Sequence, residues 1–156
     1  MKVVLLSVET VKEPWFLDLK DQYLKKIARF NPFEIVYVKS NARDRKEQDL
    51  KKQAECESLL SKIEDSDYLI TFDEKGKSFN SIEFSKKTVA GFESGKKRLV
   101  LLVGGAYGVD ENLRKRSNLI VSLSDMTMNH LVAQIVVLEQ FYRALTIWKG
   151  VPYHNE

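Results

Sequence analysis

Gly104, Gly105 and Gly108 directly follow the apolar run Leu99–Val103 and could shape a ligand-binding turn. The run shows no alternation of apolar and polar residues, which is typical of a strand buried on both faces of a parallel sheet. Glycines at the carboxyl end of such a strand allow positive φ angles and a close approach of the backbone to a ligand. Ligands of open α/β sheets bind at that edge, so the pattern predicts a small-molecule site here.

The glycine pattern alone does not name the ligand, because GGxxG also occurs in ordinary tight turns after strands. Neither the dinucleotide fingerprint GxGxxG nor the P-loop pattern GxxxxGK(S/T) occurs in the chain. Their absence disfavours a P-loop site, and it also disfavours a nucleotide-binding oxidoreductase on a doubly wound sheet.

Polar side chains near the end of the chain form a second group of candidates. Arg143 carries a planar guanidinium that suits an oxyanion, but Glu139, four residues earlier, offers it an ion pair instead. Tyr153 and His154 lie at the terminus, where an exposed, frayed segment is the alternative. His130 is a further acid–base candidate, or simply the residue that caps the last helix.

Alternating strands and helices would position these groups. The predicted strands are Lys2–Val8, Phe33–Val38, Tyr68–Phe72, Arg98–Val103 and Leu119–Leu123. Three helices are predicted at Trp15–Arg29, Asp110–Arg116 and His130–Lys149. A further helix ends near Glu64, and another begins at the cap Asn80 and is closed by Gly95. A turn is predicted at Asp73–Lys77. Three loops, 71–76, 104–108 and 122–129, then converge at the carboxyl ends of strands. We expect a mostly parallel sheet flanked by helices, in one domain spanning residues 1–156.

The composition is that of an ordinary globular chain. It has 156 residues, 44% apolar and 30% charged, with a formal net charge of +3, which is compatible with RNA binding without proving it. Cys56 is the single cysteine, which excludes an intramolecular disulfide and a cysteine-based zinc site. We find no signal-peptide pattern, nor any run near the ~20 apolar residues that cross a bilayer, and expect a cytoplasmic protein without membrane contact.

Two further stretches indicate contacts with other molecules. The segment Lys39–Lys52 is rich in lysine and arginine; a solvated loop leading into a polar helix is favoured, and a segment touching RNA phosphates is the alternative. The helix predicted at His130–Lys149 is apolar on several sides, which favours a subunit interface.

Five segments occur together in a characteristic order: TFDEKGK, LLVGGAYG, SLSDMT followed three residues later by histidine, EQFYRA, and a terminal PYH. With this set the chain resembles the RlmH-type methyltransferases of bacteria, which modify N3 of a pseudouridine in 23S ribosomal RNA of the large subunit. The resemblance extends over essentially the whole chain, from KVVLLSV to PYH.

The resemblance implies a SPOUT-type α/β fold with a C-terminal trefoil knot, a homodimer, and S-adenosylmethionine held by the knot loops without a metal ion. It implies that the RNA substrate is rRNA within the assembled ribosome, and recognition of a folded particle suits the small net charge of +3. The residues that it assigns to the cofactor are Phe72, Gly105, Ser124, Asp125, Met126, Thr127, Met128 and Asn129.

Methyl transfer to a ring nitrogen requires alignment of donor and acceptor and removal of the N3 proton. Arg143, Tyr153 and His154 are the residues that we assign to catalysis, with Arg143 contacting a phosphate or the developing charge. Tyr153 and His154 would complete the RNA-facing site, and the group that takes the proton stays open.

Three positions depart from the family pattern. Asn129 stands in place of a proline, Gln134 in place of an arginine, and Glu9 in place of a glycine. The first two motivate an alternative, namely a non-catalytic ribosome-binding module that keeps the fold. Cofactor binding without transfer to ribosomes would distinguish that module from an enzyme.

Overall fold

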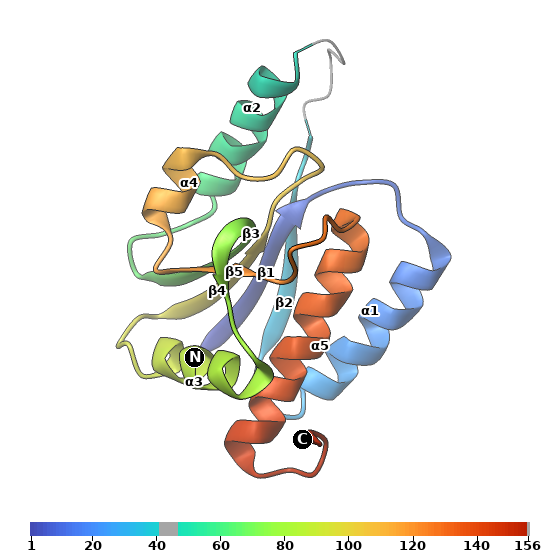
Figure 1. Cartoon of the computed structure of the whole chain (residues 1–156), viewed down its shortest axis with the longest axis vertical. Helices are drawn as coiled ribbons and strands as arrows, with labels where there is room; N and C mark the ends of the chain where they lie inside the picture. Colours follow the sequence, from blue (N-terminus) through green and yellow to red (C-terminus); the bar gives the residue numbers. More distant parts are fainter. Residues whose placement is uncertain (41–46, 156) are drawn as a thin grey trace.

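A five-stranded, fully parallel sheet forms the centre of the computed structural model, which describes residues 1–40 and 47–155 (Figure 1). The strands are β1 (Lys2–Val8), β2 (Phe33–Val38), β3 (Asp67–Ser78), β4 (Arg98–Val103) and β5 (Leu119–Ser122), in the spatial order β2-β1-β4-β3-β5. The predicted α/β class with a parallel sheet is confirmed.

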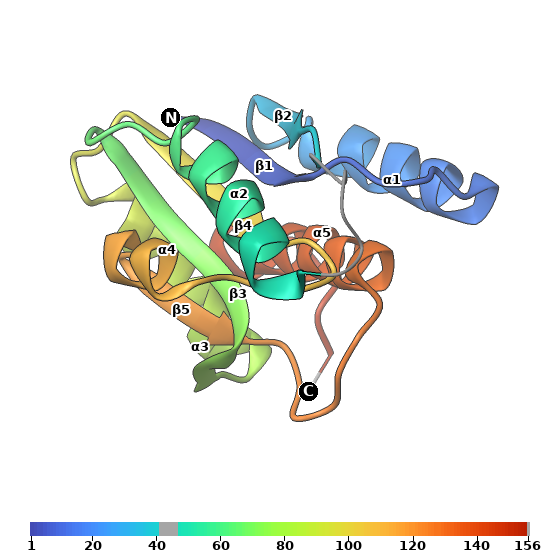
Figure 2. The same cartoon turned by 90° about the horizontal axis from the view of Figure 1, so that it is seen from above.

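Helices cover both faces of the sheet. They are α1 (Pro14–Ile27), α2 (Gln48–Leu60), α3 (Ser81–Phe92), α4 (Glu111–Arg116) and α5 (His130–Lys149). Helices α1, α3 and α5 contribute to one hydrophobic core, whereas α2 and α4 contribute to the other. Figure 2 shows α2 and α4 together over the same side of the strands.

The central strands are buried on both faces, as their unbroken apolar runs predict. In β1, Val3 and Leu5 belong to the core under α5, while Val4 and Leu6 belong to the core under α2. Strand β4 alternates in the same way, with Leu99 and Leu101 on one side and Val100 and Leu102 on the other. Both strands therefore end at a carboxyl edge that two helical layers surround.

Strand β3 is longer than the sequence indicates, and the turn predicted at Asp73–Lys77 is wrong. Phe72 pairs with Val121 of β5, the chain bulges outward, and Lys77 then pairs with the same Val121. Gly76 permits this return because a Cβ there would lie 2.6 Å from the backbone nitrogen of Val121. The bulge places Asp73 and Glu74 at the carboxyl edge of the sheet.

The helix termini follow local signals. Asn80 caps α3 by accepting from the Glu83 amide at 2.8 Å, and the Glu83 carboxylate accepts from the Asn80 amide at 3.1 Å, so the predicted cap is a complete capping box. α1, α2 and α3 end two to four residues earlier than predicted, and α1 and α3 end shortly before the breaks at Asn31-Pro32 and Gly95. None of the helices in the described ranges is both long and apolar enough to cross a membrane.

Much of the apolar surface of helix α5 is buried against other elements of the same chain. It buries eight residues, among them Phe141 and Leu138, against the sheet and against α1 and α3. Val132 and Trp148 stay 41% and 37% exposed. The predicted subunit interface is not tested by one chain, and the basic residues Arg43, Arg45 and Lys46 lie outside the described residues.

Candidate functional site

A cavity of about 270 Å³ opens at the carboxyl edge of the sheet, where the three predicted loops converge. Its walls come from the β3 bulge, the loop after β4, the loop before α5, one residue each of α2 and α4, and two residues of α5. Of the eight residues assigned to a cofactor, six line it: Phe72, Gly105, Ser124, Met126, Thr127 and Met128. Asp125 and Asn129 belong to the same loop but do not line the cavity.

The glycine turn is shaped by close approach more than by unusual dihedral angles. Only Gly108 of the three glycines has a positive φ, at 78°, and its amide donates to the Gly105 carbonyl at 3.0 Å. A Cβ on Gly104 would meet Val109 Cγ1 at 2.9 Å, and one on Gly105 would meet Glu55 Oε2 at 2.5 Å. The expectation of positive φ thus holds at Gly108, and the other two are needed because neighbouring groups occupy the Cβ space.

An ion pair forms part of the cavity wall. The Arg114 guanidinium donates through Nε to Asp73 Oδ2 at 2.7 Å and through Nη2 to the Val109 carbonyl at 2.7 Å. Both side chains are largely buried, with 13% and 6% exposed for Arg114 and Asp73. The hydrogen bond to Asp73 raises the pKa of Arg114 above its ordinary value, so this wall carries a fixed, oriented pair of charges.

The loop before α5 is folded by its own polar groups. The Ser124 hydroxyl accepts from the Met126 amide at 3.0 Å, and Ser122 donates to the Ser124 carbonyl at 3.1 Å. Met126 is 79% exposed at the cavity rim. Asn129, and not His130, caps α5, because its side chain accepts from the Leu131 amide at 2.8 Å.

His130 is the first residue of α5 and lines the cavity. Its Nε2 lies 2.9 Å from Thr10 Oγ1. Burial lowers the pKa of His130, and the negative charge of Glu55 acts in the opposite direction. The imidazole is therefore neutral at pH 7.

The three residues assigned to catalysis lie together around Glu139. The Arg143 guanidinium donates to Glu139 Oε1 from Nε at 3.0 Å, so the alternative of an i,i+4 ion pair is confirmed. The Tyr153 hydroxyl donates to the same oxygen at 3.1 Å, and the Arg143 guanidinium lies 4.7 Å from the Tyr153 ring centre. His154 Nδ1 lies 3.2 Å from Arg143 Nη1.

The tail reaches this cluster because the chain reverses after α5. Gly150 adopts a left-handed conformation with φ 66°, which ends the helix and turns the last residues back. The Tyr153 ring then packs edge-on against Tyr142, with centroids 4.7 Å apart. The tail is thus packed and not frayed, contrary to the simplest expectation for a terminus.

Hydrogen bonding, burial and charge together keep Arg143 and Tyr153 protonated. The hydrogen bond to Glu139 raises the pKa of Arg143, and burial together with the Glu139 charge raises that of Tyr153 to about 12. Because a guanidinium only donates, the His154 Nδ1 that faces it accepts, and the Nε2 of the same ring carries a proton. The cluster therefore presents the Arg143 cation, the protonated phenol of Tyr153 and an N–H donor on His154.

His154 also borders a second cavity of about 520 Å³, which lies between α3, β5 and α5. This cavity shares Phe72 and Leu123 with the first. The structure therefore brings the cofactor loops together with each other and the catalytic candidates together with each other. Arg143 and Tyr153 line neither cavity.

Two of the three departures from the family pattern are accommodated by local hydrogen bonds, whereas the third, Gln134, keeps a buried Nε2 without a partner among the described residues. Asn129 supplies the cap of α5, and the Glu9 amide donates to the Val38 carbonyl at 2.8 Å, as a glycine amide would. Gln134 is fully buried and accepts from the Tyr37 hydroxyl at 3.1 Å, and burial raises the pKa of Tyr37 to about 12. Asn129 and Glu9 therefore keep the local backbone interactions, and of the two residues that motivate the non-catalytic alternative, Asn129 gives it no structural support.

Sequence reasoning missed several residues of the cavity. Lys52 and Tyr107 line it, and Arg114 pairs across 41 positions with Asp73. The run Arg114–Arg116 just after the glycine turn was the available signal for a cation at this edge. Within the described part of the chain, no group of three or more histidine, cysteine, aspartate or glutamate side chains could hold a metal ion.

Comparison with known proteins shows which family this chain resembles over its length. The family model of predicted SPOUT methyltransferases matches residues 1–154. A protein of Bdellovibrio bacteriovorus is 47% identical over 155 residues, which cover 99% of both chains. Proteins of Parabacteroides distasonis and Streptococcus pneumoniae are 34% and 35% identical over at least 99% of both chains. Each of these relatives bears the name ribosomal RNA large subunit methyltransferase H.

Proposed function

The chain belongs to the SPOUT methyltransferase family, and on this premise we propose that it methylates ribosomal RNA of the large subunit. The reaction that we propose transfers a methyl group from S-adenosylmethionine to N3 of a pseudouridine in 23S rRNA, within assembled ribosomes in the cytoplasm. The observation that carries the proposal is the cavity at the carboxyl edge, where six of the eight expected cofactor residues meet.

The residues of this cavity fit S-adenosylmethionine. Phe72, Met126 and Met128 offer apolar surface for an adenine ring, and the Gly105 backbone carries no Cβ that would hold a ligand away. Arg114 and Lys52 supply cations suited to a carboxylate. The cofactor supplies the methyl group as a sulfonium electrophile.

The terminal cluster fits the acceptor side of the reaction. Arg143 is charged at every working pH and stabilises the anion that forms when the N3 proton leaves to water. With a pKa near 12, Tyr153 is no base at pH 7; its hydroxyl fixes Glu139 and thereby Arg143. The Nε2 proton of His154 donates to the RNA from the edge of the second cavity.

The SPOUT knot and the homodimer are part of the proposal. Arg143 and Tyr153 lie outside the cofactor cavity of their own chain, so a dimer that sets one protomer's tail beside its partner's cavity would complete the site. The exposed α5 residues Val132 and Trp148 support such a contact. The whole chain, residues 1–156, then acts as one SPOUT domain.

Calorimetric titration with S-adenosylmethionine tests the cofactor site first. The wild-type protein should bind, and Gly105→Val should not, because the new Cβ would lie 2.5 Å from Glu55 Oε2 and push the loop out of place. Gly95→Ala is the control, because it also strains the backbone at a glycine, here one with φ 76°, but lies outside the cavity, so the variant should still bind the cofactor. A folded wild-type protein that does not bind would contradict the site as a stand-alone pocket.

Mass spectrometry of ribosomal RNA tests the transfer. Ribosomes lacking the modification should gain one methyl group on a pseudouridine with wild-type protein and none with Arg143→Ala. Cofactor binding without any transfer would support the non-catalytic module instead.

A further inference from the structure

Glu55 is a buried carboxylate directly behind the glycine turn. It lies in α2 with 4% of its surface exposed, and its Oε1 accepts from the Ser40 hydroxyl at 2.6 Å. Its Oε2 is buried and has no hydrogen-bond partner within the described residues. A buried carboxylate oxygen without a partner is costly, so such a group calls for an explanation.

The unpartnered oxygen faces the cavity wall. A Cβ on Gly105 would lie 2.5 Å from Glu55 Oε2, so the carboxylate sits against a residue of the wall that has no side chain. No ion pair joins Glu55 to a lysine or arginine among the described residues. Its charge already acts on the cavity residue His130. Within residues 1–40 and 47–155, no ion pair offsets the charge of Glu55, and its field extends into the cavity.

The proposed reaction changes the charge of the ligand in this cavity. S-Adenosylmethionine carries a sulfonium, an ammonium and a carboxylate, whereas its product S-adenosylhomocysteine carries a thioether and is neutral overall. A fixed negative charge beside the cavity attracts the first ligand more than the second.

We infer that Glu55 is a specificity-determining residue, which makes the cavity prefer the cationic methyl donor to its neutral product. This inference rests on the proposed function and deepens it. Ser40 holds the carboxylate in place, and Gly105 brings the bare backbone close enough for the charge to act. Loss of the sulfonium charge on transfer then weakens binding and favours product release.

Calorimetry with both ligands on wild type, Glu55→Gln and Glu57→Gln tests the inference. Glu55→Gln keeps the shape and the acceptor for Ser40 while removing the charge, and should lower the donor-to-product affinity ratio about tenfold. Glu57→Gln removes the same charge from an exposed position of α2, where Glu57 accepts from Gln53, and should leave the ratio unchanged. A parallel change in both affinities, or no change, would overturn the inference.

A series of ligands on the wild-type protein covers the case in which Glu55→Gln does not fold. The amine analogue, with a protonated nitrogen in place of the sulfonium, should bind about as tightly as the donor, and both should bind more tightly than the neutral product. A wild-type protein that binds all three equally overturns the inference but keeps the cofactor site. A wild-type protein that binds none overturns both the inference and the proposed cofactor site.

Discussion

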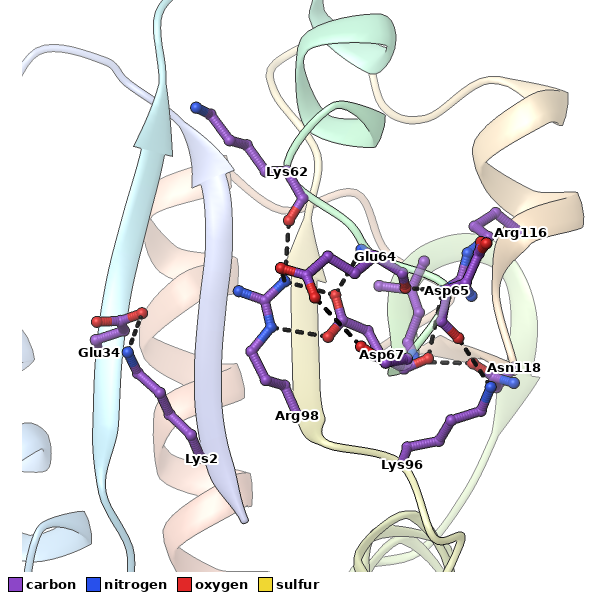
Figure 3. Close-up of polar contacts among 12 residues, drawn as sticks. Lys2, Glu34, Lys62, Glu64, Asp65, Asp67, Lys96, Arg98, Arg116 and Asn118 are labelled. Carbon is purple, nitrogen blue, oxygen red and sulfur yellow. Dashed lines mark hydrogen bonds and ion pairs between the residues drawn. The ribbon is translucent and has the colours of Figure 1, made fainter.

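Asp67 and Asp73 both lie in β3, and each pairs with an arginine, but the two pairs stand in different surroundings. Asp67 is fully buried at the amino edge of the sheet, and Arg98 reaches both its oxygens at 2.8 and 2.6 Å. Figure 3 shows this network, in which the Glu64 amide donates to the Asp67 carboxylate and the Lys62 carbonyl accepts from Arg98. At the other edge, Asp73 and Arg114 face a cavity.

The two ion pairs differ because protein groups fill the space at the amino edge of the sheet, whereas a cavity lies at the carboxyl edge. At the amino edge, the Arg98 Nη2 donates to the Lys62 carbonyl and Arg116 donates to the Asp67 carbonyl at 3.1 and 3.3 Å, so protein groups close the network. At the carboxyl edge the three loops meet around a cavity that protein groups do not fill. The same residue types therefore serve stability at one edge and are available to a ligand at the other.

Asp67→Asn tests the amino-edge pair and should give the largest effect. It removes the charge of a fully buried partner and leaves Arg98 only the exposed Glu64, whose Oε1 lies 3.7 Å away, which should lower the free energy of unfolding by about 3 kcal/mol. Urea denaturation measures this loss, and the affinity for S-adenosylmethionine should stay within about twofold. Equal losses of stability and affinity would remove the distinction between the two edges.

The same pair should carry a pH signature. Burial alone would raise the pKa of Asp67, but the hydrogen bonds from Arg98 and the Glu64 amide outweigh it and lower the pKa. Because the folded pKa lies below the unfolded value of about 3.9, the stabilisation is complete above that pH and is lost as the pH falls further. The wild-type advantage over Asp67→Asn should be constant above about pH 5 and shrink below about pH 4. An advantage that grows in acid would contradict the assignment.

Matched arginine-to-lysine changes sharpen the comparison. Arg114→Lys keeps the charge but cannot hold both Asp73 and the Val109 carbonyl, and should weaken S-adenosylmethionine binding about tenfold with a loss of about 1 kcal/mol in stability. Arg98→Lys should cost stability alone. Calorimetry and urea denaturation on both variants separate the two roles, and reduced affinity in Arg98→Lys would argue against them.

The smallest expected effect belongs to the tail. Tyr153→Phe removes the hydrogen bond to Glu139 and should lower the free energy of unfolding by about 1 kcal/mol or less. It should reduce kcat on ribosomes about threefold with KM unchanged, because Arg143 keeps its ion pair with Glu139.

The pH–rate profile gives the matching control. Since the pKa of Tyr153 is about 12, the profiles of wild type and Tyr153→Phe should have the same shape up to about pH 10. A limb near neutral pH that disappears with the hydroxyl would show that a phenolate takes the proton.

The amino-acid sequence by itself determined most of the elements and the edge of the sheet at which the cavity lies. Unbroken apolar runs such as Leu99–Val103 require burial on both faces, and the pair Asn80 and Glu83 begins a helix through local hydrogen bonds. Both signals act between near neighbours in the chain, so they can be read without the fold. The convergence of the three loops follows because parallel strands share one carboxyl edge.

Only the tertiary structure decided which side chains meet. Three contacts join residues that lie 41 to 50 positions apart in the chain. They are the return of β3 to Val121 after its bulge, the ion pair of Asp73 with Arg114, and the position of Glu55 behind Gly105. Periodicity says which face of an element is buried, and does not say which distant group occupies the space beside it. The left-handed turn at Gly150 likewise converts a terminal PYH into a packed cluster, because it sets the direction in which the tail leaves α5.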